Sequence, residues 1–296
     1  TQLHILSDNL QRVSASSMAQ SFGLKPGASF EAFQQQVPVS DYASWEKLIE
    51  EQKQSGKALL TGENCKRYQP TSGSTSKMKW IPYSPSFLKE VDRAIGPWVS
   101  DLYSFLPGSR SGRHFWSISW VPTALRKEIA GNVNDDSKLL PWWKSVFMGL
   151  TMAVPQDVSG AESSEASVFA SLCYLAATED LSVMSVWSPT FALNFFEQLA
   201  RYRDRIAQSL DNGRWDSAWA SELNFLSCPR SRRNAAVLRA WDGLMDPHFF
   251  QALWPQLSLV SSWATSSSRV WAERLHGLLP HAHFQGKGLL ATEGVV

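Results

Sequence analysis

The amino-acid sequence predicts an α/β fold in which largely parallel sheets are flanked by helices. Short β-like runs alternate with longer segments of helical periodicity, the pattern of strands joined by helical crossovers. Apolar residues make up 44% of the 296 positions, enough for a sizeable buried core. A chain of this length forms one large domain or two modest ones, and any subdomain boundary is expected near residues 180–230.

Two helices in the N-terminal third carry recognisable end signals. The segment SDYASWEKLIEEQKQSG has Asp41 as its N-cap and Gly56 as its stop, with apolar side chains at helical spacing between them. The segment SPSFLKEVDRAIGPWVSDLYSFL predicts a longer helix that begins at Ser84 or Ser86 and contains Pro97. Both ends of the first helix and the start of the second are therefore predicted from local chemistry.

The rest of the chain alternates between strand and helix signals. The strand-like segments are RHFWSISWVP (113–122), LSVMSVW (181–187), LSLVSSWA (257–264) and AHFQGKGLLATEG (282–294). The helical segments are EASVFASLCYLAATED (165–180), SPTFALNFFEQLARYRDRIAQSL (188–210), RSRRNAAVLRAWDGL (230–244) and SSRVWAERLHGLL (267–279). This order indicates consecutive strands that run parallel.

Charge and cysteine content argue against several classes of protein. The chain has 28 Lys and Arg against 27 Asp and Glu, so its formal net charge of +1 disfavours an electrostatic nucleic-acid binder. Cys65, Cys173 and Cys228 are an odd, widely spaced set that fits neither a disulfide framework nor a metal site and favours a reducing cytosol. No segment is typical of a signal peptide or a membrane span, so we expect a cytoplasmic protein that does not bind membranes.

The stretch TSGSTSKMK, residues 71–79, lies between a β-like run ending near Tyr68 and the apolar run WIPY. A flexible linker is disfavoured because the stretch is short. An ordinary polar turn stays open, since Ser, Thr and Gly dominate turns for local reasons. An anion-binding loop is the third interpretation, because hydroxyls and amides near Gly73 can donate to phosphate oxygens and Lys77 and Lys79 supply positive charge.

This stretch resembles the phosphate-binding loop of the acyl-adenylate-forming enzymes, T-S-G-[ST]-T-G-x-P-K, at seven of nine positions. Ser76 replaces a Gly of that pattern and Met78 replaces a Pro. The flanking segments narrow the resemblance to the plant-type acyl-acid amido synthetases, the auxin-responsive Gretchen Hagen family. After the loop, the sequence has the family's K-x-[IM]-P pattern. Further segments resemble those of the family and come in the same order: VWSPTFALNFFEQL, LWPQLSLVSSWATSSS and GLLATEGVV.

The resemblance implies a site for ATP and Mg²⁺. The loop residues that would donate hydrogen bonds to phosphate are Thr71, Ser72, Gly73, Ser74 and Thr75. Lys79 would add positive charge as a catalytic group. In the second motif, ATEG, Thr292 would lie beside the α-phosphate, and Glu293 would act in catalysis as an oxygen ligand of Mg²⁺. The alternative for Glu293, from its residue type alone, is a solvated residue in a turn.

Small residues end the predicted strand LSLVSSWA. Ligands of open α/β sheets bind beyond the carboxyl ends of strands, so Ala264, Thr265 and Ser266 are a candidate floor for adenine or the acyl group. The alternative is an ordinary strand-to-helix turn in which Ser266 or Ser267 is the N-cap.

Tryptophan is enriched, at 14 residues. Large aromatic side chains bury much area and also line apolar pockets. Trp116 and Trp120, on one predicted strand, and Val99, on the helix after the loop, are candidates for an apolar acyl pocket. Ordinary core packing is the alternative for each of them.

The resemblance implies two half-reactions. An acyl carboxylate attacks the α-phosphorus of ATP to give acyl-AMP and pyrophosphate, and an amine, expected to come from an amino acid, then displaces AMP. Positioning and charge stabilisation carry most of such chemistry. An acyl-CoA ligase that shares the adenylation step is an alternative.

The later motifs of the family do not occur in this sequence. In the family, a ribose-binding Asp motif and a C-terminal domain with a catalytic Lys follow the ATEG motif. We therefore expect residues 1–296 to be an incomplete N-terminal adenylation domain whose C-terminal domain is missing or supplied by another chain. A truncated domain that binds nucleotide or a partner without catalysis is the second alternative.

Overall fold

The computed structural model describes residues 2–14, 16–65, 67–71, 79–117, 151–287, 290–291 and 294–295. These residues divide into two compact units. The first unit runs to Ile95 and includes 290–291 and 294–295, and the second holds the remaining described residues from Gly96 to 287. Residues 180–230, near which a boundary was expected, all lie in the second unit.

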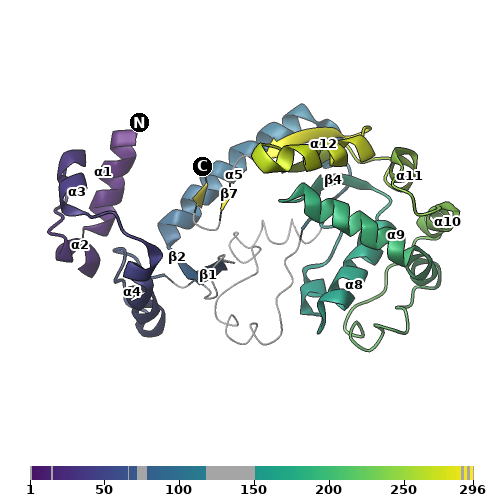
Figure 1. The fold of residues 1–296 in the computed structure, drawn as a ribbon, viewed down its shortest axis with the longest axis horizontal. Coiled ribbons are helices and arrows are strands. Elements are labelled where there is room, and N and C mark those ends of the chain that lie inside the picture. Colours follow the sequence, from purple (N-terminus) through teal and green to yellow (C-terminus); the bar gives the residue numbers. More distant parts are fainter. Residues whose placement is uncertain are drawn as a thin grey trace. The chain divides into compact units, whose positions relative to one another are not determined.

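The first unit is mostly helical (Figure 1). Its described elements are α1 (Gln2–Val13), α2 (Ser17–Ser21), α3 (Phe30–Gln36), α4 (Tyr42–Ser55), the hairpin of β1 (Arg67–Thr71) and β2 (Lys79–Tyr83), the start of α5 (Pro85–Phe105), and the hairpin of β7 (Leu290–Ala291) and β8 (Gly294–Val295). A small apolar cluster formed by Leu10, Ala19 and Leu24 joins the first helices.

The end signals read from the sequence are confirmed in α4. The Asp41 carboxylate accepts a hydrogen bond from the Ser44 backbone N–H at 3.1 Å, as an N-cap residue does. Gly56 ends the helix with φ at 68°, in the left-handed region that a side chain disfavours.

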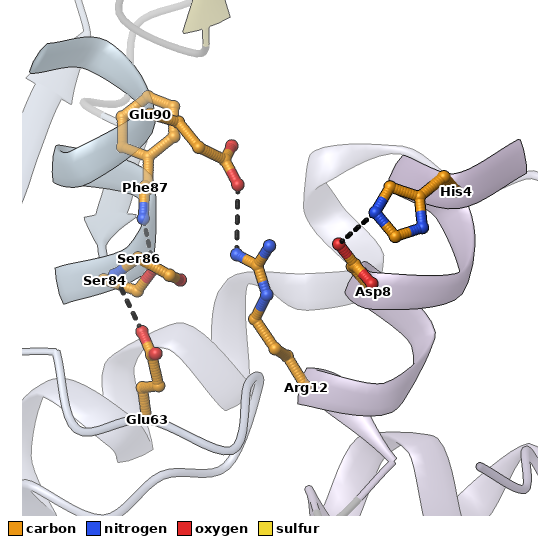
Figure 2. Close-up of polar contacts among 8 residues, drawn as sticks. All are labelled: His4, Asp8, Arg12, Glu63, Ser84, Ser86, Phe87 and Glu90. Carbon is orange, nitrogen blue, oxygen red and sulfur yellow. Dashed lines mark hydrogen bonds and ion pairs between the residues drawn. The ribbon is translucent and has the colours of Figure 1, made fainter. Parts of the chain in front are cut away.

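At the start of α5, one carboxylate and one hydroxyl accept hydrogen bonds from backbone N–H groups of the first turn (Figure 2). Of the two expected caps, Ser84 is the one used, because its hydroxyl accepts from the Phe87 N–H at 3.2 Å. Glu63 accepts from the Ser86 N–H at 2.9 Å and so satisfies a further free donor of the first turn. Arg12 of α1 pairs with Glu90 of α5 at 3.0 Å and ties these two helices together.

The second unit is built on a four-stranded sheet in the order β3 (Arg113–Trp116), β4 (Leu181–Ser185), β5 (Leu259–Trp263) and β6 (His283–Lys287). All three strand pairs are parallel, which confirms the predicted fold class. The end of the RHFWSISWVP segment, including Trp120, lies outside the described residues.

Helices fill the connections between these strands. They are α8 (Ser164–Ala177), α9 (Pro189–Asn212), α10 (Arg232–Ala240), α11 (Pro247–Leu253) and α12 (Arg269–Leu278), with 3₁₀ turns at η1 (Pro107–Arg110), η3 (Gln156–Gly160) and η4 (Ser266–Ser268). Four of these helices, α8, α9, α10 and α12, lie where the sequence predicts helices, whereas α11 was not predicted. Figure 1 shows α8 and α9 side by side. Across the described ranges, no helix is long and apolar enough to cross a membrane.

The two faces of the sheet have different partners because side chains alternate along each strand. Phe115, Met184 and Val260 point to one face and join the large core formed with α8, α9 and α12. On the other face, Val183 and Leu259 contact Leu102 of α5. The C-terminal part of α5 therefore covers the face opposite to the connecting helices.

Candidate functional site

The Ser/Thr/Gly-rich stretch is anchored at both ends by an antiparallel hairpin. In the register of β1 and β2, Thr71 is paired directly with Lys79. Strands therefore flank residues 72–78 on both sides, as the sequence predicted, and their pairing makes the two strand ends neighbours. The loop residues themselves, Ser72, Gly73, Ser74 and Thr75, lie outside the described residues, as does the side chain of Thr71.

Helix α4 supports the base of this hairpin through Tyr42. The Tyr42 hydroxyl accepts from the Trp80 N–H at 2.8 Å and lies 3.4 Å from the Trp80 carbonyl oxygen. Trp80 thus directs its backbone groups toward α4 rather than toward Pro70, its partner in β1, which has no N–H to offer. Lys79 Nζ lies 5.5 Å from the centre of the Tyr42 ring, and Lys53 Nζ lies 3.5 Å from that of Trp80.

In the second unit, the small residues after β5 form a strained turn. Thr265 and Ser266 are exposed, and Ser266 has a φ of 54°, which is uncommon for a residue with a side chain. Such strain is frequent at ligand-binding turns. The N-cap position of α12 is Ser268, so the alternative in which Ser266 or Ser267 caps this helix is wrong.

Ala264 packs closely on the neighbouring strand. A Cβ placed on Gly286 of β6 would lie 3.2 Å from the Ala264 side chain. A larger residue at either position would push the ends of β5 and β6 apart, so this close approach keeps the carboxyl end of the sheet narrow.

Val99 and Trp116, two of the residues assigned to an acyl pocket, line one cavity. Its volume is about 20 Å³, room for roughly one water molecule. The lining side chains come from α5 and from strands β3, β4 and β5: Trp98, Val99, Leu102, Tyr103, His114, Trp116, Val183, Ser185, Leu259 and Ser261. The assignment of Val99 and Trp116 to an acyl group stays a prediction, because the cavity itself is too small for an acid.

The sequence did not single out Lys287, at the end of β6. Its Nζ donates to the Ser185 hydroxyl at 2.8 Å and lies 4.4 Å from the ring centre of Trp187 and 5.9 Å from that of Trp116. Burial lowers the pKa of Lys287 to about 7. In the predicted strand HFQGK, residues 283, 285 and 287 share one face. This alternation was the signal in the sequence that could have placed Lys287 on the same face as its strand neighbours.

Polar and aromatic groups surround this amine. Trp263, which pairs with Lys287 in the register of β5 and β6, has a buried Nε1 without a hydrogen-bond partner. The Gln285 side-chain oxygen accepts from Trp98 Nε1 at 3.1 Å and from the Ser261 hydroxyl at 3.3 Å. The carboxyl end of the sheet therefore offers hydrogen-bond donors among large apolar surfaces.

The ATEG segment, predicted to be a second nucleotide motif, begins in β7 and ends in β8, two short paired strands. Ala291 of β7 is paired with Gly294 of β8, whereas Thr292 and Glu293 lie outside the described residues. Across the ranges that the structure does describe, no group of three or more His, Cys, Asp or Glu could hold a metal ion. The assignment of Mg²⁺ to Glu293 therefore stays a prediction.

Comparison with known proteins matches this chain to one family model and to solved structures of one fold. The model of the GH3 family N-terminal domain matches residues 1–284. Two solved structures, "GH3.15 acyl acid amido synthetase" and "AtGH3.15 acyl acid amido synthetase in complex with 2,4-DB", match with TM-scores of 0.72 and 0.71 at 14% identity. The matches cover 99% and 97% of this chain, which spans 52% of the length of each matched chain. A comparison with curated protein sequences gave no match.

Proposed function

The chain belongs to the GH3 family, as its N-terminal domain, and from this premise we propose that it activates a carboxylic acid with ATP. The carboxylate attacks the α-phosphorus, forming acyl-AMP and pyrophosphate. An amine, in our proposal that of an amino acid, then attacks the acyl carbon, forms an amide and releases AMP. The named activity of the matched structures, acyl acid amido synthetase, supports this reaction class.

The hairpin at the base of the loop is the observation that carries the proposal. Thr71 and Lys79 face each other across β1 and β2, and Tyr42 fixes the backbone of the next residue, Trp80. Phosphate binding requires groups held on a rigid base, and the paired strand ends would provide such a base for residues 72–78. Lys79, the first residue of β2, would add positive charge at this base.

Each candidate residue has a role in this scheme. Residues 71–75 would hold phosphate oxygens, and Thr292 would lie beside the α-phosphate. Ala264, Thr265 and Ser266 would form the floor beneath adenine or the acyl group. Val99, Trp116 and Trp120 would lie against the acyl group. Glu293 is the carboxylate that would bind Mg²⁺, which prefers oxygen ligands and would neutralise phosphate charge.

The test is acid-dependent exchange of pyrophosphate into ATP by the natural polypeptide that contains this sequence. A panel of aliphatic and aromatic monocarboxylates is assayed with Mg²⁺. Lys79→Ala is expected to lower exchange by about tenfold or more, because it removes a charge that stabilises the transferring group. Lys25→Ala, at an exposed position, is the matched control and is expected to match the parent protein.

The outcomes separate the alternatives. Amide formation with amino acids supports the proposal, whereas thioester formation with coenzyme A would assign the acyl-CoA ligase reaction. Binding of ATP without exchange for any acid would leave a nucleotide-binding domain without catalysis. If Lys79→Ala folds and exchanges pyrophosphate at the parent rate, the role given to this loop is wrong.

A further inference from the structure

Four tryptophans gather around Lys287 on the face of the sheet that α5 covers: Trp98, Trp116, Trp187 and Trp263. The ring centres of Trp98 and Trp116 are 6.2 Å apart, and those of Trp187 and Trp263 are 6.1 Å apart. This cluster lies at the carboxyl ends of parallel strands, where open α/β sheets bind ligands.

The amine of Lys287 has no counter-anion among the described residues. Its one hydrogen-bond partner there is the Ser185 hydroxyl, and no ion pair includes it. The faces of Trp187 and Trp116 stabilise an ammonium group but leave its charge uncompensated. A partly buried cation of this kind is stabilised when an anion approaches.

A second donor at the same strand ends lacks an acceptor. Trp263 Nε1 is buried without a partner, and Trp263 is paired with Lys287 across β5 and β6. Buried N–H groups normally have an acceptor. A buried N–H without one, on the residue paired with a lysine that lacks a counter-anion, points to a ligand that accepts hydrogen bonds. A carboxylate provides two such oxygens.

The surroundings favour a carboxylate with an apolar body over a phosphate. Trp187 is 41% exposed, so its ring is accessible next to the amine. An aromatic or aliphatic acid can stack on this ring while its carboxylate reaches Lys287, whereas a strongly hydrated phosphate gains nothing from indole surfaces.

We propose that Lys287 binds the carboxylate of the acid substrate, with Trp263 Nε1 as a second donor and Trp187 as the platform for the acid's apolar body. This inference rests on the proposed function, because it names the groups that orient the acid for attack on ATP. Lys287 is then a substrate-binding residue, and the tryptophans around it contribute to the choice of acid.

The test is calorimetric titration of the natural polypeptide with monocarboxylates, among them phenylacetate, beside the neutral phenylacetamide. Lys287→Met keeps the length of the side chain but removes its charge, and Lys287→Arg keeps the charge. We expect the dissociation constant for phenylacetate to rise about tenfold or more in Lys287→Met, in line with the loss of a charge-assisted hydrogen bond. Phenylacetamide should bind the parent and Lys287→Met equally weakly, and Lys25→Met should behave as the parent.

Titration with inorganic phosphate and with AMP tests whether Lys287 binds a phosphate group instead of a carboxylate. Their affinities are expected to be unchanged in Lys287→Met. Loss of phosphate or AMP binding with unchanged phenylacetate binding would overturn the inference and assign Lys287 to the nucleotide. It is also overturned if no acid of the panel binds the parent protein, or if Lys287→Met, shown to be folded by its circular dichroism spectrum, binds acids as well as the parent does.

Pyrophosphate exchange separates this inference from the proposed function. Exchange in the parent protein together with acid binding that is indifferent to Lys287 would overturn the inference alone. Acid binding that depends on Lys287, without exchange for any acid, would keep the carboxylate site and overturn the proposed reaction.

Discussion

At the scale of single residues, Lys287 shows how burial can create a site that is costly for the folded chain. Lysine is strongly hydrated in water, and at the end of β6 it exchanges that hydration for one hydroxyl and the faces of two indoles. Desolvation lowers its pKa to about 7. A protein tolerates such a group where a ligand provides what the fold leaves out.

This burial predicts a dependence of stability on pH. In the unfolded chain the pKa of Lys287 returns to its ordinary 10.5, so from about pH 7 to 10 the unfolded state binds more protons than the folded state. The free energy of unfolding should therefore rise with pH, by at most about 1.4 kcal/mol per unit from this group. Lys287→Met should lack this rise.

Urea unfolding of the parent protein and of Lys287→Met across this pH range measures the effect as a difference, in which other groups cancel. The other titratable groups on the face of the sheet that α5 covers are His114, Tyr103 and the exposed His283. Burial lowers the pKa of His114 and raises the pKa of Tyr103. Parallel pH profiles for the two proteins would show that the amine is not desolvated in solution.

At the scale of elements, the hairpin of β1 and β2 depends on a helix that precedes it in the chain. The Tyr42 hydroxyl of α4 takes the place that a further strand would occupy beside Trp80. This edge is therefore satisfied by a side chain, which both stabilises the hairpin and protects the edge from pairing with another chain.

Removal of this hydroxyl should loosen the base of the loop. Tyr42→Phe leaves the N–H of the buried Trp80 without a partner, which costs about 1–3 kcal/mol of the free energy of unfolding. If the loop holds phosphate, ATP affinity should fall in the same variant. Tyr103→Phe is the matched control, since the Tyr103 hydroxyl makes no hydrogen bond within the described part of the chain, and equal effects of the two changes would contradict this account.

The start of α5 makes a second prediction for an element. The hydrogen bond from the Ser86 N–H lowers the pKa of Glu63 below 4.5, so its contribution to stability is present above that pH and lost as the pH falls through the folded value. Glu63→Gln should lower the free energy of unfolding by about 1 kcal/mol at neutral pH.

This difference from the parent protein should vanish in acid, as followed by urea unfolding at several pH values. Glu51→Gln, at an exposed site of α4, is the control and should have little effect. A deficit of Glu63→Gln that persists in acid would show that the charge of this carboxyl is unimportant to α5.

At the scale of the whole molecule, the two units differ in how much apolar surface they bury. The second unit holds one large core around the parallel sheet, α8 and α9. The cluster that joins the first helices has Leu10, Ala19 and Leu24 as its buried members. Burial of apolar surface is the main source of stability, so the two units should differ in resistance to opening.

Hydrogen exchange measured by mass spectrometry should reveal this difference. Amides of β4, α8 and α9 are expected to exchange slowest, and those of α1, α2 and α3 should exchange orders of magnitude faster, because their opening exposes little apolar surface. The amides of α4 that lie against the hairpin should be intermediate. Equal protection of α1 and α8 would show that the first helices are held by more than their own small core.

Local chemistry in the sequence determined the kinds and limits of many elements. Asp41 and Gly56 act on backbone groups within a turn of themselves, so the ends of α4 were predictable. The alternation of strand and helix signals predicted the parallel sheet, and the order of motifs predicted the family. Capping was less predictable after β5, where three serines follow one another and Ser268 takes the N-cap position of α12 without a side-chain hydrogen bond.

Only the tertiary structure decided what surrounds Lys287. Its amine meets the hydroxyl of Ser185, 102 positions earlier in the chain, and the indole of Trp116, earlier still. No local pattern encodes such a contact, because it depends on which strands are neighbours and on the face that each strand turns toward α5. The sequence by itself therefore determined the family, the fold class and the presence of strands on both sides of residues 72–78. The desolvated amine arose from packing between distant segments, since burial is a property of the assembled sheet.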